Sequence, residues 1–190
     1  MARPVQYLTK FLFGAILLLC ACARQRSTLR VSISDAGFSQ HGELLLYHGQ
    51  PFNGITYSMY PNRDTARRAE YIDGKQDGWL KWWYPNKQID QIRFFADGKK
   101  QGTHRGWWPN GQLKFEYQFT DDELNGELKE WDANGKMYRF FHYKMGHEEG
   151  SEKMWWEDGR IRANYVIING EKFGLYGQKL CLNGLRKQSL

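Results

Sequence analysis

Histidine and cysteine are the residue types in this 190-residue chain best suited to metal binding or nucleophilic catalysis. A metal site would need them at short recurring spacings, such as two histidines one helical turn apart. No histidine pair has that spacing and none stands beside a cysteine; the histidines are His41, His48, His104, His142 and His147. The paired acids Asp121-Asp122 and Glu148-Glu149 are interpreted as solvated loop residues. The sequence therefore predicts no catalytic residues, no metal, no cofactor and no enzyme activity.

The N-terminal segment has the three regions of a secretory signal peptide. Met1–Lys10 contains Arg3 and Lys10 and no acid, Phe11–Leu19 is almost wholly apolar, and small residues follow. The apolar run is shorter than the ~20 residues that a membrane-spanning helix needs. We therefore predict a signal-peptide helix within residues 1–21 that cleavage removes.

Cys22 is the candidate for covalent modification. The stretch Leu19-Cys20-Ala21-Cys22 resembles the bacterial lipobox, and Cys22 fits better than Cys20 because a small residue precedes it. The resemblance implies a lipid on Cys22, whose acyl chains would anchor the protein to a membrane. Ala23 is not the Asp of the inner-membrane retention signal, so the expected location is the outer membrane of the bacterial envelope, facing the periplasm.

Composition excludes several classes of protein. The chain has 8 Trp, 11 Tyr and 11 Phe, with 20 Gly but only 5 Pro, which argues against intrinsic disorder and a polytopic membrane protein. Removal of Arg3 and Lys10 with the signal peptide lowers the formal charge from +6 to +4. Cys181 would then be the one cysteine without lipid, so the mature chain has no intramolecular disulfide.

The chain repeats every 24 residues from about residue 47. The repeat glycines recur at that interval without insertion: Gly54, Gly78, Gly102, Gly126, Gly150 and Gly174. Aromatic residues stand seven positions before most of them, and Asn or Asp eight positions after. Five columns in phase over six units indicate a repeat architecture.

Each unit has the pattern of a β-hairpin. Gly78–Tyr84 is rich in aromatic residues and short enough for a strand. Asn134-Gly135 and Asp158-Gly159 favour tight turns because these residues tolerate positive φ. Leu113–Phe119 and Met137–Tyr143 then follow as returning strands. The prediction is an all-β, single-layer antiparallel meander of repeated hairpins.

The repeats resemble the bacterial variant of the MORN family, whose pattern is roughly Tyr-x-x-Gly-Lys-x-x-Gly-x-x-x-x-Trp-Tyr-x-x-Gly. Residues 71–87 follow it closely except that Lys87 replaces the last glycine, and residues 95–111 and 143–159 also fit. The outer units depart from it, with Arg63 at the hairpin glycine of the first and Lys179 at the Trp position of the last. Atypical end units are expected of a solenoid, because they cap the stack.

The predicted organisation combines these segments. It consists of a signal peptide (1–21), a tether (22–30), N-terminal cap strands (31–46) and six repeats (47–70, 71–94, 95–118, 119–142, 143–166 and 167–190). Leu29–Ile33 and Glu43–Tyr47 are the segments expected to form the cap strands.

Three columns are candidate binding residues. The Trp column is Trp83, Trp107, Trp131 and Trp155, and the second aromatic column is Tyr60, Tyr84, Trp108 and Trp156. The basic column is Lys81, Arg105, Lys129 and Lys153. Because successive strand residues point to opposite faces, the two aromatic columns predict an aromatic stripe on each face of the sheet. The aromatic columns are interpreted either as structural ladders of packed rings or as a recognition surface. The basic column is interpreted either as a solvated face or as a surface that attracts an anionic partner. The repeat glycines are interpreted as structural turn residues.

The leading functional hypothesis is a non-enzymatic lipoprotein whose repeat sheet binds a protein partner in the envelope. The MORN resemblance offers an alternative, because bacterial proteins of this type are often described as YwqK-family antitoxins that neutralise a toxin protein. A third hypothesis is binding of glycan or the membrane surface through the Trp column. Nucleic acid is not an expected partner, since export removes the chain from it.

Overall fold

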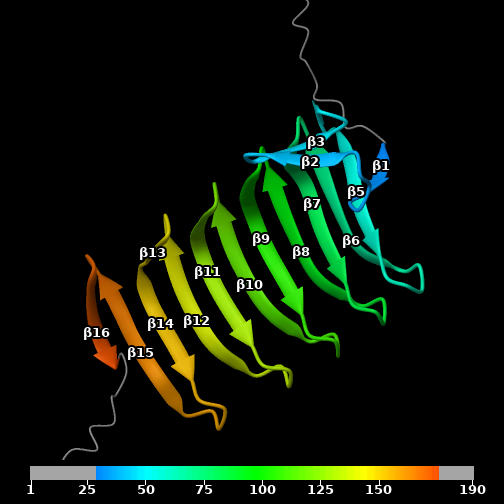
Figure 1. The fold of residues 1–190 in the computed structure, drawn as a ribbon. Coiled ribbons are helices and arrows are strands. Elements are labelled where there is room, and N and C mark those ends of the chain that lie inside the picture. Colours follow the sequence, from blue (N-terminus) through cyan, green and yellow to red (C-terminus); the bar gives the residue numbers. More distant parts are fainter. Residues whose placement is uncertain (1–28, 176–190) are drawn as a thin grey trace, which may run out of the picture.

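The structure is a computed structural model that describes residues 29–175. Within this range the secondary structure consists of sixteen β-strands. The predicted signal peptide, the lipidation site Cys22, most of the tether, and Lys179 and Cys181 of the last unit lie outside the described residues. Figure 1 shows strands laid side by side into one long sheet, with a second small sheet at its N-terminal end.

The main sheet has thirteen strands, and from β5 to β12 each strand pairs antiparallel with the next along the chain. Both β13 and β14 then pair with β12, and β15 and β16 continue the antiparallel order. The predicted single-layer meander is therefore confirmed. Its strands after the first are β5 (Gly54–Met59), β6 (Thr65–Ile72), β7 (Lys75–Trp83), β8 (Ile89–Ala96), β9 (Lys99–Trp107), β10 (Leu113–Thr120), β11 (Glu123–Trp131), β12 (Met137–Lys144), β13 (His147–Glu148), β14 (Gly150–Trp155), β15 (Ile161–Ile168) and β16 (Glu171–Leu175).

The N-terminal end departs from a simple meander. β1 (Arg30–Ser32) pairs with β5, but in parallel. Between them the chain forms a separate sheet of β2 (Phe38–His41), β3 (Leu44–Tyr47) and β4 (Gln50–Pro51). The segment between β1 and β5 brings the chain back to the main sheet running in the same direction as β1, as a parallel pair requires. The meander consequently starts at Gly54, and the preceding residues 47–53 of the first unit lie off the main sheet.

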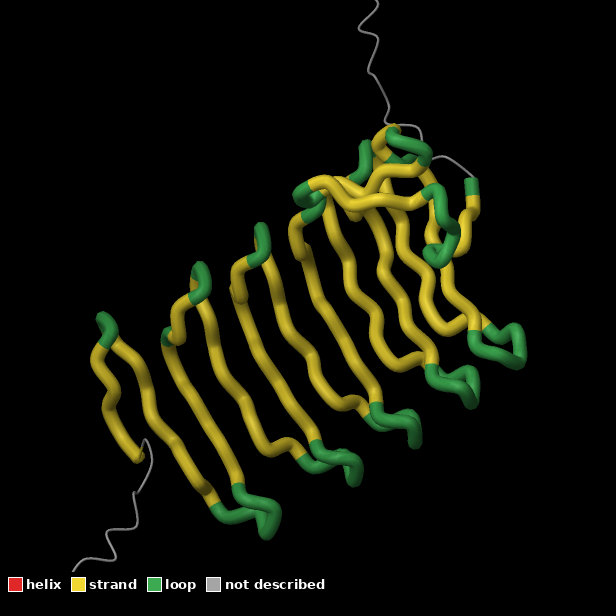
Figure 2. The backbone as a smooth tube through the Cα atoms, viewed as in Figure 1, coloured by secondary structure: helices red, strands yellow, loops and turns green. Residues whose placement is uncertain are grey.

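The hairpin turns repeat one geometry. The Oδ1 atoms of Asn62, Asn86 and Asn110 each accept a hydrogen bond from the backbone N–H two residues later, at 3.1 Å. The following residue has positive φ, whether it is a glycine or, as in the first two hairpins, Arg63 (φ 68°) or Lys87 (φ 69°). The turn therefore forms even where the glycine of the pattern is missing. Figure 2 shows these turns aligned along one side of the sheet.

A β-bulge follows each turn at the same place. In the second hairpin Trp82 pairs with Gln91 and Trp83 with Ile89, which leaves Asp90 without a partner in the ladder. The equivalent extra residues elsewhere are Ala66, Lys114, Tyr138 and Arg162. A bulge bends its strand and re-aims its side chain, so the extra residue interrupts the strand alternation at the same place in these five hairpins.

Burial in the single layer comes from neighbouring side chains on the sheet. One row runs across it two residues after each repeat glycine, and its members Thr56, Leu80, His104, Leu128 and Glu152 are at most 5% exposed. The small sheet adds a second contact region, where Val31, Leu45 and Phe52 pack together. The central strands are thus held by neighbours on either side rather than by an opposing layer.

Candidate binding surfaces

The basic column forms one straight row across the main sheet. Ile92 pairs with both Lys81 and Arg105, Glu116 pairs with both Arg105 and Lys129, and Phe140 pairs with both Lys129 and Lys153. Because cross-strand partners lie on the same face, the four cations share one face with these side chains. We call it the basic face.

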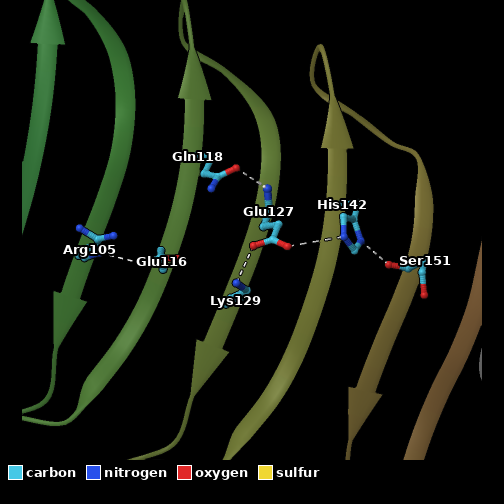
Figure 3. Close-up of polar contacts among 7 residues, drawn as sticks. All are labelled: Arg105, Glu116, Gln118, Glu127, Lys129, His142 and Ser151. Carbon is cyan, nitrogen blue, oxygen red and sulfur yellow. Dashed lines mark hydrogen bonds and ion pairs between the residues drawn. The ribbon is translucent and has the colours of Figure 1, made fainter.

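Part of the positive charge on the basic face is neutralised within the protein. Arg105 Nε lies 2.6 Å from a carboxylate oxygen of Glu116, and Lys129 Nζ lies 2.5 Å from one of Glu127, as Figure 3 shows. The amide oxygen of Gln118 accepts a hydrogen bond from the backbone N–H of Glu127 at 2.9 Å. The central cations are therefore held in fixed positions by neighbouring groups of the sheet.

His142 lies beside this network but has no partner arrangement for catalysis. Its Nε2 is 3.9 Å from Glu127, and its Nδ1 is 2.6 Å from the backbone carbonyl of Ser151 (Figure 3). A nucleophilic triad would require the serine hydroxyl at that position. The ring therefore links two strands, since its Nδ1 contacts a main-chain acceptor.

The cations also contact aromatic rings, although not those of the Trp column. Lys81 Nζ lies 5.8 Å from the ring centroid of Trp79, and Lys129 Nζ lies 5.4 Å from that of Phe140. Such contacts contribute about 0.5–1 kcal/mol at exposed sites. The Trp column itself occupies the last position of β7, β9, β11 and β14, and all four rings are partly exposed.

The second aromatic column lies elsewhere than expected. Its residues lie directly after the last residue of their strands, where the turns begin, rather than within the strands from which the stripe was predicted. The hydroxyl groups of Tyr60 and Tyr84 donate to the carbonyls of Trp83 and Trp107, at 2.7 and 2.8 Å. Trp108 Nε1 donates to the carbonyl of Trp131 at 3.0 Å. Each of these three rings therefore joins its hairpin to the next.

Two of the bulge residues stand over rings of this column. Lys114 Nζ lies 4.4 Å from the Trp108 ring centroid, and Arg162 Cζ lies 4.8 Å from that of Trp156. In the second hairpin, burial is the main cause that raises the pKa of Tyr84 to about 12, and the neighbouring Asp90 carboxylate adds to it. The protonated hydroxyl donates to the carbonyl of Trp107 in the next hairpin.

The repeat glycines all have positive φ, from 68° at Gly102 to 152° at Gly54. Gly126, at φ 114°, is in a region that non-glycine residues rarely adopt, and a Cβ atom there would meet the amide oxygen of Gln118. The same amide oxygen accepts a hydrogen bond from the backbone N–H of Glu127. The missing Cβ atom at Gly126 therefore leaves room for a contact that joins β10 to β11.

Two buried titratable residues were not identified from the sequence. Burial lowers the pKa of His104, which contacts the rings of Phe95 and Phe119. Burial, together with the charge of Glu148, raises the pKa of Glu152 to about 7, while the backbone N–H of His142 opposes the change. The sequence did contain a signal of their burial. Both residues stand two positions after a repeat glycine, where other units have the apolar residues Leu80 and Leu128.

The described residues contain no group of three or more His, Cys, Asp or Glu side chains placed to hold a metal ion. In the same range no helix has the length and hydropathy needed to cross a membrane.

Comparison with known proteins identifies two of the units. A family model described as the MORN repeat variant matches residues 100–121 and 124–145. No curated protein matches the chain. The two matched segments begin 24 residues apart, which is the interval of the repeat glycines and of the hairpins. Residues 100–145 are thus similar to two consecutive MORN repeat variants within a longer β-repeat scaffold.

Proposed function

We propose that this chain is a non-enzymatic lipoprotein, anchored through Cys22 in the bacterial envelope, whose repeat sheet is a scaffold for a protein partner. The proposed location is the outer membrane, facing the periplasm. The observation that carries the scaffold role is the row of four cations in register across seven strands, β7 to β12 and β14.

The shape of the sheet supports binding of a macromolecule. Within residues 29–175 the small sheet β2–β4 lies at the N-terminal end, and no second layer is drawn over β9–β15 in Figure 1. Long rows of side chains therefore face outward, and Trp79 is 41% exposed beside Lys81. Lys81 and Lys153 flank the two cations that Glu116 and Glu127 pair, and with the exposed Trp79 ring they suit a partner whose surface is acidic, because complementary charge steers encounter and fixes register.

The lipid anchor is tested separately from the scaffold. In a bacterial host with an outer membrane, Cys22→Ser should abolish incorporation of labelled fatty acid and leave the signal peptide attached. Cys20→Ser is the matched control and should be acylated and processed normally. Labelling that persists in Cys22→Ser would exclude the proposed anchor.

The scaffold role is tested with the mature chain carrying Cys22→Ser as bait in an envelope extract. Lys81→Glu combined with Lys153→Glu should lower recovery of a stoichiometric protein by about tenfold, since like charges at an interface are repulsive. The control combines Lys87→Glu with Arg160→Glu, which makes the same charge change at two exposed turn residues and should not reduce recovery.

The captured molecule then distinguishes the hypotheses. An envelope protein lost only with the basic-face variant supports the scaffold proposal, whereas a toxin rescued by co-expression favours the antitoxin alternative. Sedimentation with peptidoglycan in the absence of any protein partner would favour glycan binding. Equal recovery with both double variants would contradict use of the basic face.

A further inference from the structure

The second aromatic column is interrupted once between Tyr60 and Trp156. The position equivalent to Tyr84 and Trp108 in the fourth hairpin is Asp132. Its carboxylate accepts hydrogen bonds from the backbone N–H groups of Asn134 and Lys136, both at 2.9 Å. Asp132 thus closes its own turn, and no ring from this position reaches the carbonyl of Trp155, the counterpart of the carbonyls that Tyr60, Tyr84 and Trp108 contact.

A groove of about 510 Å³ lies at this interruption. Its lining includes Trp108, Asp132, Tyr138, Trp155, Trp156 and Arg162. Lys136 Nζ donates to the carbonyl of Glu157 and so links the two turns across the groove. The volume is within the range of small-ligand sites, and four of its ten lining residues are aromatic.

We propose that this groove binds the side chain of a tyrosine or tryptophan supplied by the protein partner, an inference that rests on the proposed scaffold function. The chain itself shows how such a ring fits. Tyr60, Tyr84 and Trp108 occupy three equivalent positions, and each donates to a carbonyl 23 residues further along the sequence. A ring from outside would complete the same arrangement between the fourth and fifth hairpins.

The charges around the groove favour a neutral ring with a hydrogen-bond donor. Lys136 and Arg162 are balanced by Asp132 and Glu157, which also line it. A phenol or an indole would place its donor toward a backbone carbonyl, whereas a phenylalanine ring would leave that acceptor without the bond. We therefore expect selectivity for tyrosine over phenylalanine of about fivefold, the value of one ordinary hydrogen bond.

The test uses the mature chain with Cys22→Ser and the probe N-acetyl-L-tyrosinamide, followed through the tryptophan indole signals in NMR spectra. Asp132→Tyr should fill the groove with the protein's own ring and weaken binding of the probe by at least about tenfold. Asp132→Asn is the matched control, because its amide oxygen still accepts the turn hydrogen bonds and leaves the groove open. It should bind as the wild type does.

Asp132→Tyr is expected to fold. Asn134 can take over the turn, since Asn86 and Asn110 accept from the backbone N–H groups of Gln88 and Gln112 in the hairpins that have an aromatic residue at this position. An unchanged or raised midpoint of thermal unfolding would verify this. Binding of the probe to Asp132→Tyr as tightly as to the wild type, or none to the wild type at millimolar concentration, would overturn the proposal.

Partner capture separates this inference from the scaffold function. If the partner is recovered by the wild type and Asp132→Asn but lost with Asp132→Tyr, both proposals are supported. Equal recovery with Asp132→Tyr contradicts binding of a partner ring in the groove and remains consistent with the scaffold function. Failure of the wild type to capture any protein contradicts the scaffold, while the probe titration still decides whether the groove accepts a ring.

Discussion

Glu152 is an ionisable side chain that is fully buried, although the sheet has only a single layer. The side chain is 0% exposed, and both carboxylate oxygens lie 3.1–3.2 Å from the backbone N–H of His142. β12 and β14 pair only at Arg139 and Phe140, so this carboxylate satisfies a main-chain donor beyond the end of their ladder. The cost of burying its charge is the reason that its pKa is raised.

Glu152→Gln should remove a specific pH dependence of stability. The folded-state pKa is about 7, above the value of 4.5 for the unfolded chain, so the folded state binds more protons between these pH values. The stability of the wild type relative to Glu152→Gln should therefore fall as pH rises from about 4.5 through 7. The whole change is at most about 3 kcal/mol, given the size of the pKa shift.

Chemical unfolding of both proteins at several pH values measures this difference. Comparison with the variant cancels the other titrating groups, including His104, whose lowered pKa acts in the opposite direction. A difference in unfolding free energy that stays constant between pH 5 and pH 8 would contradict the assignment.

At the scale of elements, the connection between hairpins depends on the glycine that follows it. Gly126→Ala should destabilise the protein by about 1–3 kcal/mol, because φ 114° is strained for any residue with a Cβ atom and Gln118 would have to move. Gly102→Ala is the control, since its φ of 68° is the left-handed conformation and nothing lies within 4 Å of an added Cβ. It should cost about 1 kcal/mol.

Denaturant unfolding of the two variants checks this order. Equal losses in the two variants would mean that neither the φ of 114° nor the contact with Gln118 adds to the cost of a Cβ atom at Gly126.

The elements were predictable from the sequence to the extent that local chemistry determines them. The predicted returning strands 113–119 and 137–143 are β10 and β12, each one residue longer. The prediction for the second aromatic column extends strand alternation by one residue past the strand, since β7 ends at Trp83 and Tyr84 begins the turn. The parallel pairing of β1 depends on a non-local contact with β5, for which the repeat pattern has no signal.

At the scale of the whole molecule, the repeats should behave as nearest-neighbour units. Deletion of residues 95–118 joins Phe94 to Phe119, which occupies the same column as Phe95, and the sheet should remain folded with a cooperative thermal transition. Deletion of residues 95–106 alone breaks the columns and should abolish that transition. Circular dichroism during heating compares them, and loss of folding in both deletions would show that the sheet is not modular.

The interruption at Asp132 has a consequence for how an elongated partner could sit on the sheet. Two strands per unit give a step of about 10 Å between identical side chains. If every unit carried the same side chains, a partner shifted by one unit along the sheet would make the same contacts again. Asp132 breaks this repetition at one position. If the groove beside it binds a partner ring as proposed, only one alignment of the partner along the sheet would place that ring in the groove.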